Sequence, residues 1–314
     1  MNGSRILSVA AAHPQRRVSN AELPAELNSS DEWIRTRTGI ESRGIAGEGE
    51  SIVDMAVDAA GKAIASAGID AAEVGLLIVA TSTLPTPTPG GSPEVAHRLG
   101  IPGGAIDVNG ACAGFCYALT LASDSVRAGS AKYAVVVGVE RLTDWMDWTK
   151  RDVTVLFGDG AGAVVIGQTP EDENGIGPVV WGSDGSKRDL IMVQDWGRYL
   201  EMDGPSVFRW ATVEVAEISR QACARAGIEP KDLAAFIPHQ ANLRIVEAAA
   251  KKLGLDDSTV VSDDVRINGN TSAASIPLAL ARLVEEGRIP SGGKVLLVGF
   301  GAGMCWASQV VTAP

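Results

Sequence analysis

The sequence predicts an α/β fold, and two observations lead to that prediction. Short runs rich in aliphatic residues alternate with longer segments of helical periodicity along the 314 residues, which favours strands covered by helices. The second observation is an internal repeat that makes the chain resemble two copies of one α/β unit. We expect the first copy at residues 1–170 and the second at residues 171–314.

The two kinds of segment alternate from the first copy into the second. The expected strands are 6–10, 76–80, 105–108, 134–138, 162–167, 236–238, 260–262, 294–299 and 304–311. The expected helices are 51–67, 92–99, 113–128, 207–226, 243–252 and 272–286. Strands that are separated by helices favour a mostly parallel sheet with helices on its faces.

The repeat also assigns positions to candidate functional residues. AGIDAAEVGLLIVAT at 67–81 matches AGIEPKDLAAFIPHQ at 226–240 without a gap, so His239 lies at the end of the second copy's strand. The helical segment 112–129 matches 270–287, which pairs Cys112 with Asn270 as equivalent helix starts. Because strand ends and helix starts are where α/β sheets bind ligands, we expect these three residues to converge between the copies.

Composition excludes several classes of partner. The net charge of −11 and pI near 4.8 disfavour general binding to nucleic acid or to an anionic membrane. No apolar run approaches the ~18 residues of a membrane span, and we interpret the apolar start as a first strand rather than a signal peptide. Four scattered cysteines favour a reducing compartment, so we expect a cytoplasmic protein. The three histidines lack metal-ligand spacing, so we expect no metal site.

Cys112 is the candidate nucleophile. Small residues flank it in DVNGACAGFCYAL, and an apolar run follows, which predicts a buried helix with Cys112 in its first turn. A helix start would lower the pKa of the thiol and favour the thiolate. The alternative is that the cysteine packs as a small hydrophobe, the role that we assign to Cys116, Cys223 and Cys305.

A thiolate, an imidazole and a carboxamide together suit acyl transfer. The Cys112 thiolate would attack a thioester, while neutral His239 and Asn270 would each donate a hydrogen bond to the oxygen of a malonyl thioester. Two such donors stabilise the enolate that forms when CO2 leaves. The backbone N–H groups of Cys112 and Ala302 could form an oxyanion hole. Asn270 could instead be only a helix cap.

Six motifs resemble those of the β-ketoacyl-acyl-carrier-protein synthase III family, of the thiolase fold superfamily. They are DEWIRTRTGI, DVNGACAGFCYAL, FGDGAGAVV, FIPHQANLRI, GNTSAASIP and GFGAG, and they run in the family's order over nearly the whole chain. The resemblance implies a five-layered αβαβα homodimer with Cys112 as the acylated nucleophile and His239 and Asn270 as the decarboxylation pair. It implies no bound cofactor, since coenzyme A enters as the substrate thioester.

The resemblance also implies two binding surfaces. Trp33 and Arg151 resemble the pair that sandwiches the coenzyme A adenine, with Arg37 near its phosphates and Asn242 near the pantetheine. Four basic residues resemble the surface on which the acidic acyl carrier protein docks. They are Arg209, Arg244, Lys251 and Lys252. The alternatives are an ordinary core aromatic for Trp33 and a solvated helix face for the basic residues.

The chain departs from the family in the segment TLPTPTPGGSP at 83–93. In relatives this segment crosses the dimer interface and shapes the acyl pocket, to which we assign Pro87, Thr88, Pro89 and Phe115. The bulky aromatic that some members carry there is missing, so we expect a pocket wider than in acetyl-specific relatives. The primer remains open between acetyl, branched, longer and aromatic chains.

Two other functions remain open from the sequence. One is a starter-unit ketosynthase of polyketide assembly, or an acyltransferase that moves the primer without condensing it, with the same three residues. The other is a catalytically silent subunit that only binds acyl chains or a carrier protein. Retention of all three reactive residues argues against the silent subunit. GDGAG and GFGAG precede strands, so they do not fit a dinucleotide site.

Overall fold

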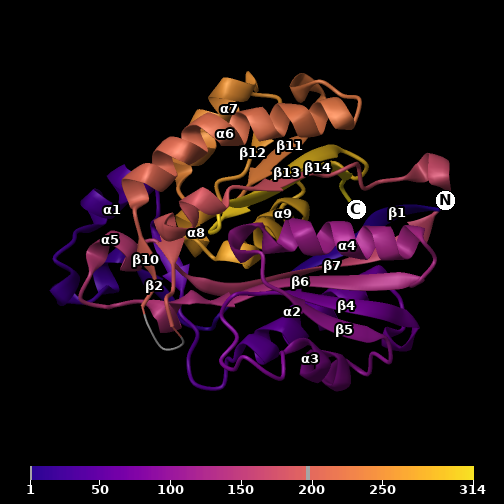
Figure 1. Ribbon diagram of the computed structural model, residues 1–314, viewed down its shortest axis with the longest axis horizontal. Coiled ribbons are helices and arrows are strands. Elements are labelled where there is room, and N and C mark those ends of the chain that lie inside the picture. The colour runs from indigo at the N-terminus through magenta and orange to yellow at the C-terminus, as the bar shows by residue number, and fades with distance from the viewer. Residues whose placement is uncertain (1, 196–198) are drawn as a thin grey trace.

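The chain folds around two five-stranded sheets of the same strand order (Figure 1). This is a computed structural model that describes residues 2–195 and 199–314. The first sheet has the order β1 (Gly3–Ala12), β7 (Asp159–Thr169), β6 (Tyr133–Arg141), β4 (Val74–Ala80) and β5 (Gly104–Val108). The second has the order β8 (Val180–Ser183), β14 (Cys305–Thr312), β13 (Lys294–Gly301), β11 (Ala235–Pro238) and β12 (Val260–Val261). The two related halves are confirmed, and we keep residue 170 as the proposed division between them.

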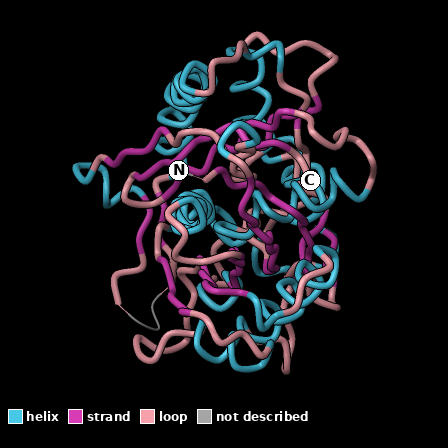
Figure 2. Tube along the Cα trace, turned by 90° about the vertical axis from the view of Figure 1, so that its right-hand side faces the viewer, coloured by secondary structure: helices cyan, strands magenta, loops and turns pink. Residues whose placement is uncertain are grey.

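Helices lie outside both sheets and between them, as the quarter-turned view also shows (Figure 2). The outer helices of the first sheet are α2 (Ile52–Ala67) and α3 (Ser92–Leu99), and those of the second are α6 (Gly204–Arg225) and α7 (Leu243–Leu253). The inner helices are α4 (Gly114–Arg127) and α9 (Ser275–Glu285), which contact both sheets. The expected five layers are therefore confirmed.

Local sequence signals explain where the helices begin and end. At α2 the Ser51 side chain accepts from the Asp54 N–H in a capping box, and Gly68 ends the helix in the left-handed conformation. At α7 the Asn242 side chain caps the first turn and Gly254 ends the last. The six predicted helices all form, and their ends differ from the prediction by a few residues.

The expected mostly parallel sheet is wrong, because each sheet is mixed. In the first sheet β4 pairs parallel with β5 and β6, whereas β7 pairs antiparallel with β6 and β1. Between β6 and β7 the chain forms only a short 3-10 turn and the four-residue helix α5 (Arg151–Thr154), with no long crossover helix. Without a long crossover the chain turns back, and β7 runs antiparallel.

Several elements were not expected from the periodicity, and most of them are too short to show a pattern. Besides β8, the strands are β2 (Arg17–Ser19), β3 (Ser42–Gly44), β9 (Ile191–Met192) and β10 (Glu201–Met202). The helices are α1 (Asp31–Thr38), α5 and α8 (Val265–Asn268). The 3-10 turns are Asn20–Glu22, Ala25–Leu27, Ala71–Glu73, Ala111–Ala113, Leu142–Trp145, Glu171–Glu173, Gly185–Leu190, Pro230–Asp232 and Ser272–Ala274.

Two glycines bring the halves into close contact. A Cβ atom on Gly138 of β6 would lie 2.3 Å from the Ala273 carbonyl oxygen, at the turn before α9. A Cβ atom on Gly299 of β13 would lie 2.9 Å from the Ala113 Cα, at the turn before α4. The central strand of each half thus contacts the helix start of the other half, which places both helix starts at the interface between the halves.

Gly138→Ala is expected to lower the free energy of unfolding by about 1–3 kcal/mol, since the added methyl group overlaps backbone that cannot rotate away. Urea unfolding of the purified variant would measure this change. Gly104→Ala is the matched control in the same sheet, because its nearest atom would be the Leu76 Cδ1 at 3.8 Å. Equal loss of stability in both variants would contradict the close-contact argument.

Candidate active site

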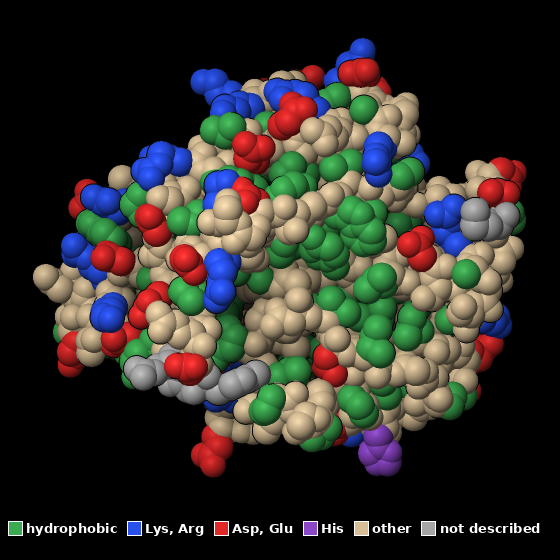
Figure 3. All heavy atoms as spheres, viewed as in Figure 1, with side chains coloured by type: hydrophobic (Ala, Val, Ile, Leu, Met, Phe, Trp, Pro, Cys, Tyr) green, Lys and Arg blue, Asp and Glu red, His purple; other side chains and the backbone are tan. Residues whose placement is uncertain are grey.

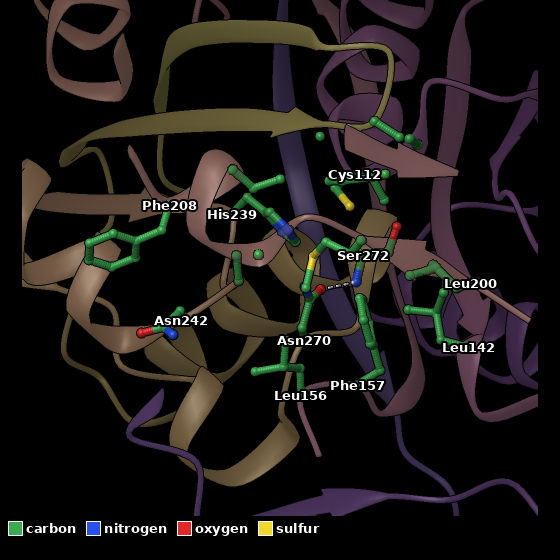
Figure 4. A pocket seen from close by; sticks show the side chains of 18 of the residues that line it. Cys112, Leu142, Leu156, Phe157, Leu200, Phe208, His239, Asn242, Asn270 and Ser272 are labelled. Atoms are coloured by element: carbon green, nitrogen blue, oxygen red, sulfur yellow. Dashed lines mark hydrogen bonds between the residues drawn. The ribbon is translucent and has the colours of Figure 1, made fainter. Parts of the chain in front are cut away.

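A cavity of about 830 Å³ lies where the halves meet and contains all three candidate catalytic residues (Figure 4). Cys112, His239 and Asn270 line it together with Ser272 and Ala302. The other labelled lining residues in Figure 4 are largely apolar. They are Leu142, Leu156, Phe157, Leu200, Phe208 and Asn242. The structure therefore brings together residues that lie far apart in the sequence.

Cys112 lies in the 3-10 turn Ala111–Ala113 that leads into α4. The turn begins with Ala111 at a φ of 46°, a conformation that alanine rarely adopts. It changes the direction of the backbone just before Cys112. Gly301 of β13 packs directly on the cysteine, because a Cβ atom there would lie 2.7 Å from the Cys112 Cβ. Only glycine admits this approach, which puts the neighbouring residue Ala302 in the same cavity.

The expectation that the helix start lowers the pKa of Cys112 is wrong. The pKa of the Cys112 thiol is raised to about 12, mainly by burial, with smaller contributions from the Glu140 and Cys305 side chains. A hydrogen-bond interaction with Ser272 opposes these effects and is smaller than burial. Burial thus outweighs the opposing hydrogen bonds, and the resting Cys112 side chain is the neutral thiol.

The expected pairing of Cys112 with Asn270 is also wrong. Ala111 and Ser272 both have a φ of 46° and each begins a 3-10 turn, so they occupy equivalent places. Counting from them, Cys112 corresponds to Ala273 and Asn270 to Asn109. The sequence match was made at the glycine ends of the two helices, but α9 has 11 residues and α4 has 14, so the starts were misaligned.

Asn270 holds the turn that begins at Ser272. Its Oδ1 accepts from the Ser272 N–H at 2.9 Å, as the dashed line in Figure 4 shows. Asn109 makes the same bond to the Ala111 N–H at 3.2 Å in the other half. Asn270 is not the helix cap that we considered, because Thr271 precedes the 3-10 turn and Ala274 precedes α9. Its bond to Ser272 leaves the Nδ2 amide as the side chain's donor.

His239 directly follows β11, and its ring is buried and uncharged. The Nδ1 atom lies 2.7 Å from the Ser275 hydroxyl, and the Phe300 ring meets the imidazole edge-on with centroids 5.2 Å apart. Burial lowers the pKa of His239 to about 3. The imidazole is therefore neutral at physiological pH and can offer one donor and one acceptor.

The residues expected at the adenine lie together around α1. The guanidinium carbon atoms of Arg37 and Arg151 lie 4.8 and 4.7 Å from the centre of the Trp33 ring. The Asn242 Nδ2 donates to the Arg37 carbonyl at 3.1 Å. Trp33, Arg37 and Asn242 line the cavity, whereas Arg151 packs on Trp33 and leaves no room for a base between the two. An adenine sandwich would require Arg151 to move.

The four basic residues expected at the carrier surface lie on α6 and α7. Arg209 and Arg244 line the cavity, and Arg244 lies 5.1 Å from the centre of the Phe208 ring. Lys251 and Lys252 lie in the last turn of α7. Figure 3 shows Lys and Arg side chains gathered on this upper part of the molecule, where Figure 1 shows α6 and α7.

The residues expected at the acyl pocket do not reach the cavity within one chain. Pro87, Thr88 and Pro89 are exposed in the loop after β4, with a cis peptide bond at Thr88-Pro89. Phe115 is completely buried in the core between the sheets. The lining of the cavity in the described chain includes none of these four residues.

Sequence analysis missed three polar residues beside the candidates. Ser275 bonds the His239 ring, the Ser272 N–H donates to Asn270, and the Ser272 hydroxyl donates to Glu140. Both serines lie inside the quoted motif GNTSAASIP, so their spacing from Asn270 was visible. Glu140 is the one acidic residue in the strand YAVVVGVER, and a carboxylate in such a strand signals a buried polar site.

The described part of the chain offers neither a metal-binding cluster nor a membrane-spanning helix. Across residues 2–195 and 199–314, no group of three or more His, Cys, Asp and Glu side chains could hold a metal ion. Over the same residues, no helix has the length and hydropathy to span a membrane.

Comparison with known proteins gives a consistent result. Family profiles described as 3-oxoacyl-[acyl-carrier-protein (ACP)] synthase III and its C-terminal part match residues 106–185 and 223–313. β-Ketoacyl-[acyl-carrier-protein] synthase III 4 of Streptomyces coelicolor is 49% identical over 314 residues, which covers 99% of each chain. The chain belongs to the 3-oxoacyl-acyl-carrier-protein synthase III family.

Other synthase III proteins extend the match. The mycobacterial β-ketoacyl-[acyl-carrier-protein] synthase III of Mycobacterium avium is 45% identical over 98% of this chain and 95% of the relative. The synthase III structure from Pseudomonas aeruginosa has a TM-score of 0.94 at 39% identity, covering 99% of this chain and 98% of that one. The priming β-ketosynthase of the R1128 polyketide pathway has a TM-score of 0.95 at 46% identity, with coverage of 99% and 96%. The expected thiolase-like fold is confirmed.

Proposed function

We propose that this synthase III condenses an acyl-CoA primer with malonyl-acyl carrier protein through an acyl-Cys112 intermediate. The observation that carries the proposal is that Cys112, His239 and Asn270 line one cavity in a chain of this family. An acyl-transferring enzyme of this type needs a nucleophile and two neutral donors in reach of one thioester, and the shared cavity lining of Cys112, His239 and Asn270 supports these roles.

In the first half-reaction the Cys112 sulfur attacks the primer's thioester carbon. The oxyanion that forms meets the backbone N–H groups of Cys112 and Ala302, which are our proposed oxyanion hole. When the carbonyl re-forms, the carbon–sulfur bond to coenzyme A breaks, and the thiol proton of Cys112 ends on the coenzyme A sulfur. The raised pKa of Cys112 means that this proton leaves as the attack proceeds, not before it.

In the second half-reaction the malonyl thioester loses CO2 and becomes an enolate. The thioester oxygen takes the developing charge, and the donors we assign to it are the Nε2–H of His239 and the Nδ2–H of Asn270. A Ser275 hydroxyl that donates to Nδ1 keeps the imidazole proton on Nε2. The enolate carbon then attacks the acyl-cysteine, and the Cys112 sulfur leaves and regains a proton.

The His239 ring is expected to stay uncharged through the neutral range. Burial lowers its pKa to about 3, so the neutral ring persists above that pH and is lost only as the pH falls through about 3. With only three histidines in the chain, NMR of histidine-labelled protein can follow the ring, and His239→Gln assigns its signal. A His239 signal that titrates between about pH 5 and 8 would contradict this expectation.

The substrates would bind at the two surfaces described above. We assign coenzyme A to Trp33, Arg37, Arg151 and Asn242, with Arg151 leaving the Trp33 ring to admit the base. We assign the acidic carrier protein to the basic residues of α6 and α7. They are Arg209, Arg244, Lys251 and Lys252. The protein would be cytoplasmic and would work without a bound cofactor.

A homodimer is part of the proposal. The first sheet ends at β5, whose outer edge pairs with no other strand of residues 2–195 and 199–314, and Ile106 on that strand is 44% exposed. Leu121 of α4 and Trp181 of β8 are also exposed, and Figure 3 shows hydrophobic side chains gathered where α4 lies in Figure 1. A second copy of the chain would cover this face. Sedimentation at micromolar concentration should give the dimer mass, and a monomer would overturn this assignment.

A polyketide starter-unit role is the second candidate, and one observation favours it. The R1128 priming ketosynthase matches this chain in fold and at 46% identity, which is as similar as several relatives named synthase III. The catalytic residues do not separate the two roles, because both use the same three.

One experiment tests the function and another separates its variants. Intact-protein mass spectrometry after incubation with a panel of acyl-CoAs should show one added acyl group and identify the preferred primer. CO2 release from malonyl-carrier protein then distinguishes condensation from acyl transfer alone. Absence of any acyl-enzyme across the panel would favour the silent binding subunit and overturn the proposal.

A further inference from the structure

Asn109 is a polar residue of the cavity lining that no step above uses. It directly follows β5, and Ser82 lies in the loop after β4, which pairs parallel with β5. Both residues line the cavity beside Ala111 and Cys112. The carboxyl ends of neighbouring parallel strands are where α/β sheets bind ligands. Two polar side chains therefore lie at the ligand-binding edge of the first sheet, close in sequence to the proposed nucleophile or hydrogen-bonded to a residue that is.

The orientation of the Asn109 amide is fixed by its hydrogen bonds. The Ala111 N–H donates to the side chain at 3.2 Å, and since a backbone N–H can only donate, the atom that it meets is Oδ1. The Ser82 hydroxyl donates to the same Oδ1 at 3.0 Å. Within residues 2–195 and 199–314, no hydrogen bond uses the Asn109 Nδ2, and the residue is exposed. The two N–H groups on Nδ2 are therefore open to a ligand.

Ser82 is held just as firmly and offers the opposite chemistry. Its backbone N–H donates to the Glu140 carboxyl group at 3.1 Å, and its hydroxyl gives its single proton to Asn109. The serine oxygen keeps its lone pairs, so Ser82 can only accept from a ligand. The cavity thus contains a donor on Asn109 and an acceptor on Ser82, and the two side chains are bonded to each other.

Asn109 has the same place in the first half as Asn270 in the second. Each Oδ1 accepts from the N–H two residues further on, at Ala111 and Ser272, and each Nδ2 is left as a donor in the same cavity. Asn270 is assigned to the malonyl thioester. Asn109 lies in the segment that leads into Cys112, so the nearest part of a substrate is the acyl group bonded to that sulfur.

We propose that Asn109 and Ser82 select primers whose acyl chain carries a hydroxyl group. A hydroxyl oxygen can accept from the Asn109 Nδ2 while its proton goes to the Ser82 oxygen, so one substituent satisfies both residues. A wholly apolar chain would cover the amide and remove its water without replacing the hydrogen bond, which is unfavourable. This inference rests on the proposed function, because it concerns the primer that acylates Cys112.

The test compares four-carbon primers that differ only in the hydroxyl group. They are butyryl-CoA, 2-hydroxybutyryl-CoA and 3-hydroxybutyryl-CoA, and intact-protein mass spectrometry measures the second-order rate constant of Cys112 acylation for each. We expect the wild type to prefer one of the hydroxybutyryl primers to butyryl-CoA by about tenfold, the effect of a hydrogen bond that is otherwise lost.

In Asn109→Ala this preference should fall to about one. Alanine also removes the bond to the Ala111 N–H, which slows acylation by every primer, but that loss is common to the primers and cancels in the ratio. Ser82→Ala is the second variant, because it removes the acceptor while Ala111 still orients the Asn109 amide. It should lower the preference by several-fold.

Asn242→Ala is the matched control. It removes another asparagine from the lining of the same cavity, one that we assign to coenzyme A and that donates to the Arg37 carbonyl. Since coenzyme A is common to all three primers, their rates should fall together and the ratio should stay as in the wild type.

The outcomes separate this inference from the proposed function. If butyryl-CoA acylates Cys112 and the ratio is the same in the wild type and Asn109→Ala, the inference is overturned and the proposed function stands. If no primer acylates Cys112, both are overturned. An unchanged ratio together with a raised KM for malonyl-carrier protein in Asn109→Ala would assign the amide to the malonyl carboxylate and would also overturn the inference.

Discussion

Cys112→Ala is expected to abolish acyl-enzyme formation. The proposed mechanism forms its only covalent intermediate on this sulfur, and an alanine has no group that can attack a thioester. Intact-protein mass spectrometry after incubation with the preferred acyl-CoA should show one added acyl group on the wild type and none on the variant. Condensation should fall by about 10³-fold or more, because no other step can bypass the intermediate.

Cys305→Ala is the informative control for that experiment. The Cys305 sulfur contacts the Gly110 carbonyl at 3.3 Å and the Ala302 carbonyl at 3.1 Å, so a second thiol lies close to the proposed oxyanion hole. We expect Cys305→Ala to retain the acyl group. If labelling persisted in Cys112→Ala and disappeared in Cys305→Ala, the nucleophile would be Cys305 and the proposed mechanism would be wrong.

The layers of the fold could be predicted because its signals are repeated along the chain. The match between residues 67–81 and 226–240 describes the same helix-to-strand connection in both halves, and the two sheets have the same strand order. Strand direction was not predictable in the same way. Whether β7 runs back beside β6 depends on the length of helix between them, and the segment after β6 showed no clear period.

The position of the three candidate residues followed from the motifs, but their physical state did not. A sequence shows that Cys112 precedes a helix, and it does not show that Gly301 packs on the cysteine or how much protein surrounds the sulfur. Burial therefore reversed the expected direction of the pKa. The pairing of Cys112 with Asn270 was wrong for a related reason. The sequence match aligned the glycines that follow α4 and α9, and because the two helices differ in length, their starts were not aligned.

Glu140 was hidden from the sequence because its partners come from three separate places. The donors Thr81 and Thr83 follow β4, Glu140 is the last residue but one of β6, and Ser272 comes from the second half. No spacing along the chain connects these segments, and only the contact between the halves brings them together. Polar networks of this kind depend on tertiary packing more than on any local pattern.

His239→Ala is expected to separate the two half-reactions. Acylation of Cys112 uses the backbone oxyanion hole, whereas the His239 Nε2–H is assigned to the malonyl thioester oxygen. The variant should therefore still gain one acyl group from the primer. CO2 release from malonyl-carrier protein should fall by about 100- to 1,000-fold, the usual loss when one donor to a developing oxyanion is removed.

Ser275→Ala tests whether the hydrogen bond to Nδ1 orients the His239 ring. The Ser275 hydroxyl lies 2.7 Å from Nδ1 and contacts no proposed substrate atom, so its loss should weaken the orientation of the ring without removing the Nε2 donor. We expect CO2 release to fall by less than in His239→Ala, while labelling of Cys112 stays intact in both variants. If His239→Ala abolished labelling as completely as Cys112→Ala, the imidazole would be needed to activate the thiol, and its assignment to the decarboxylation step alone would be wrong.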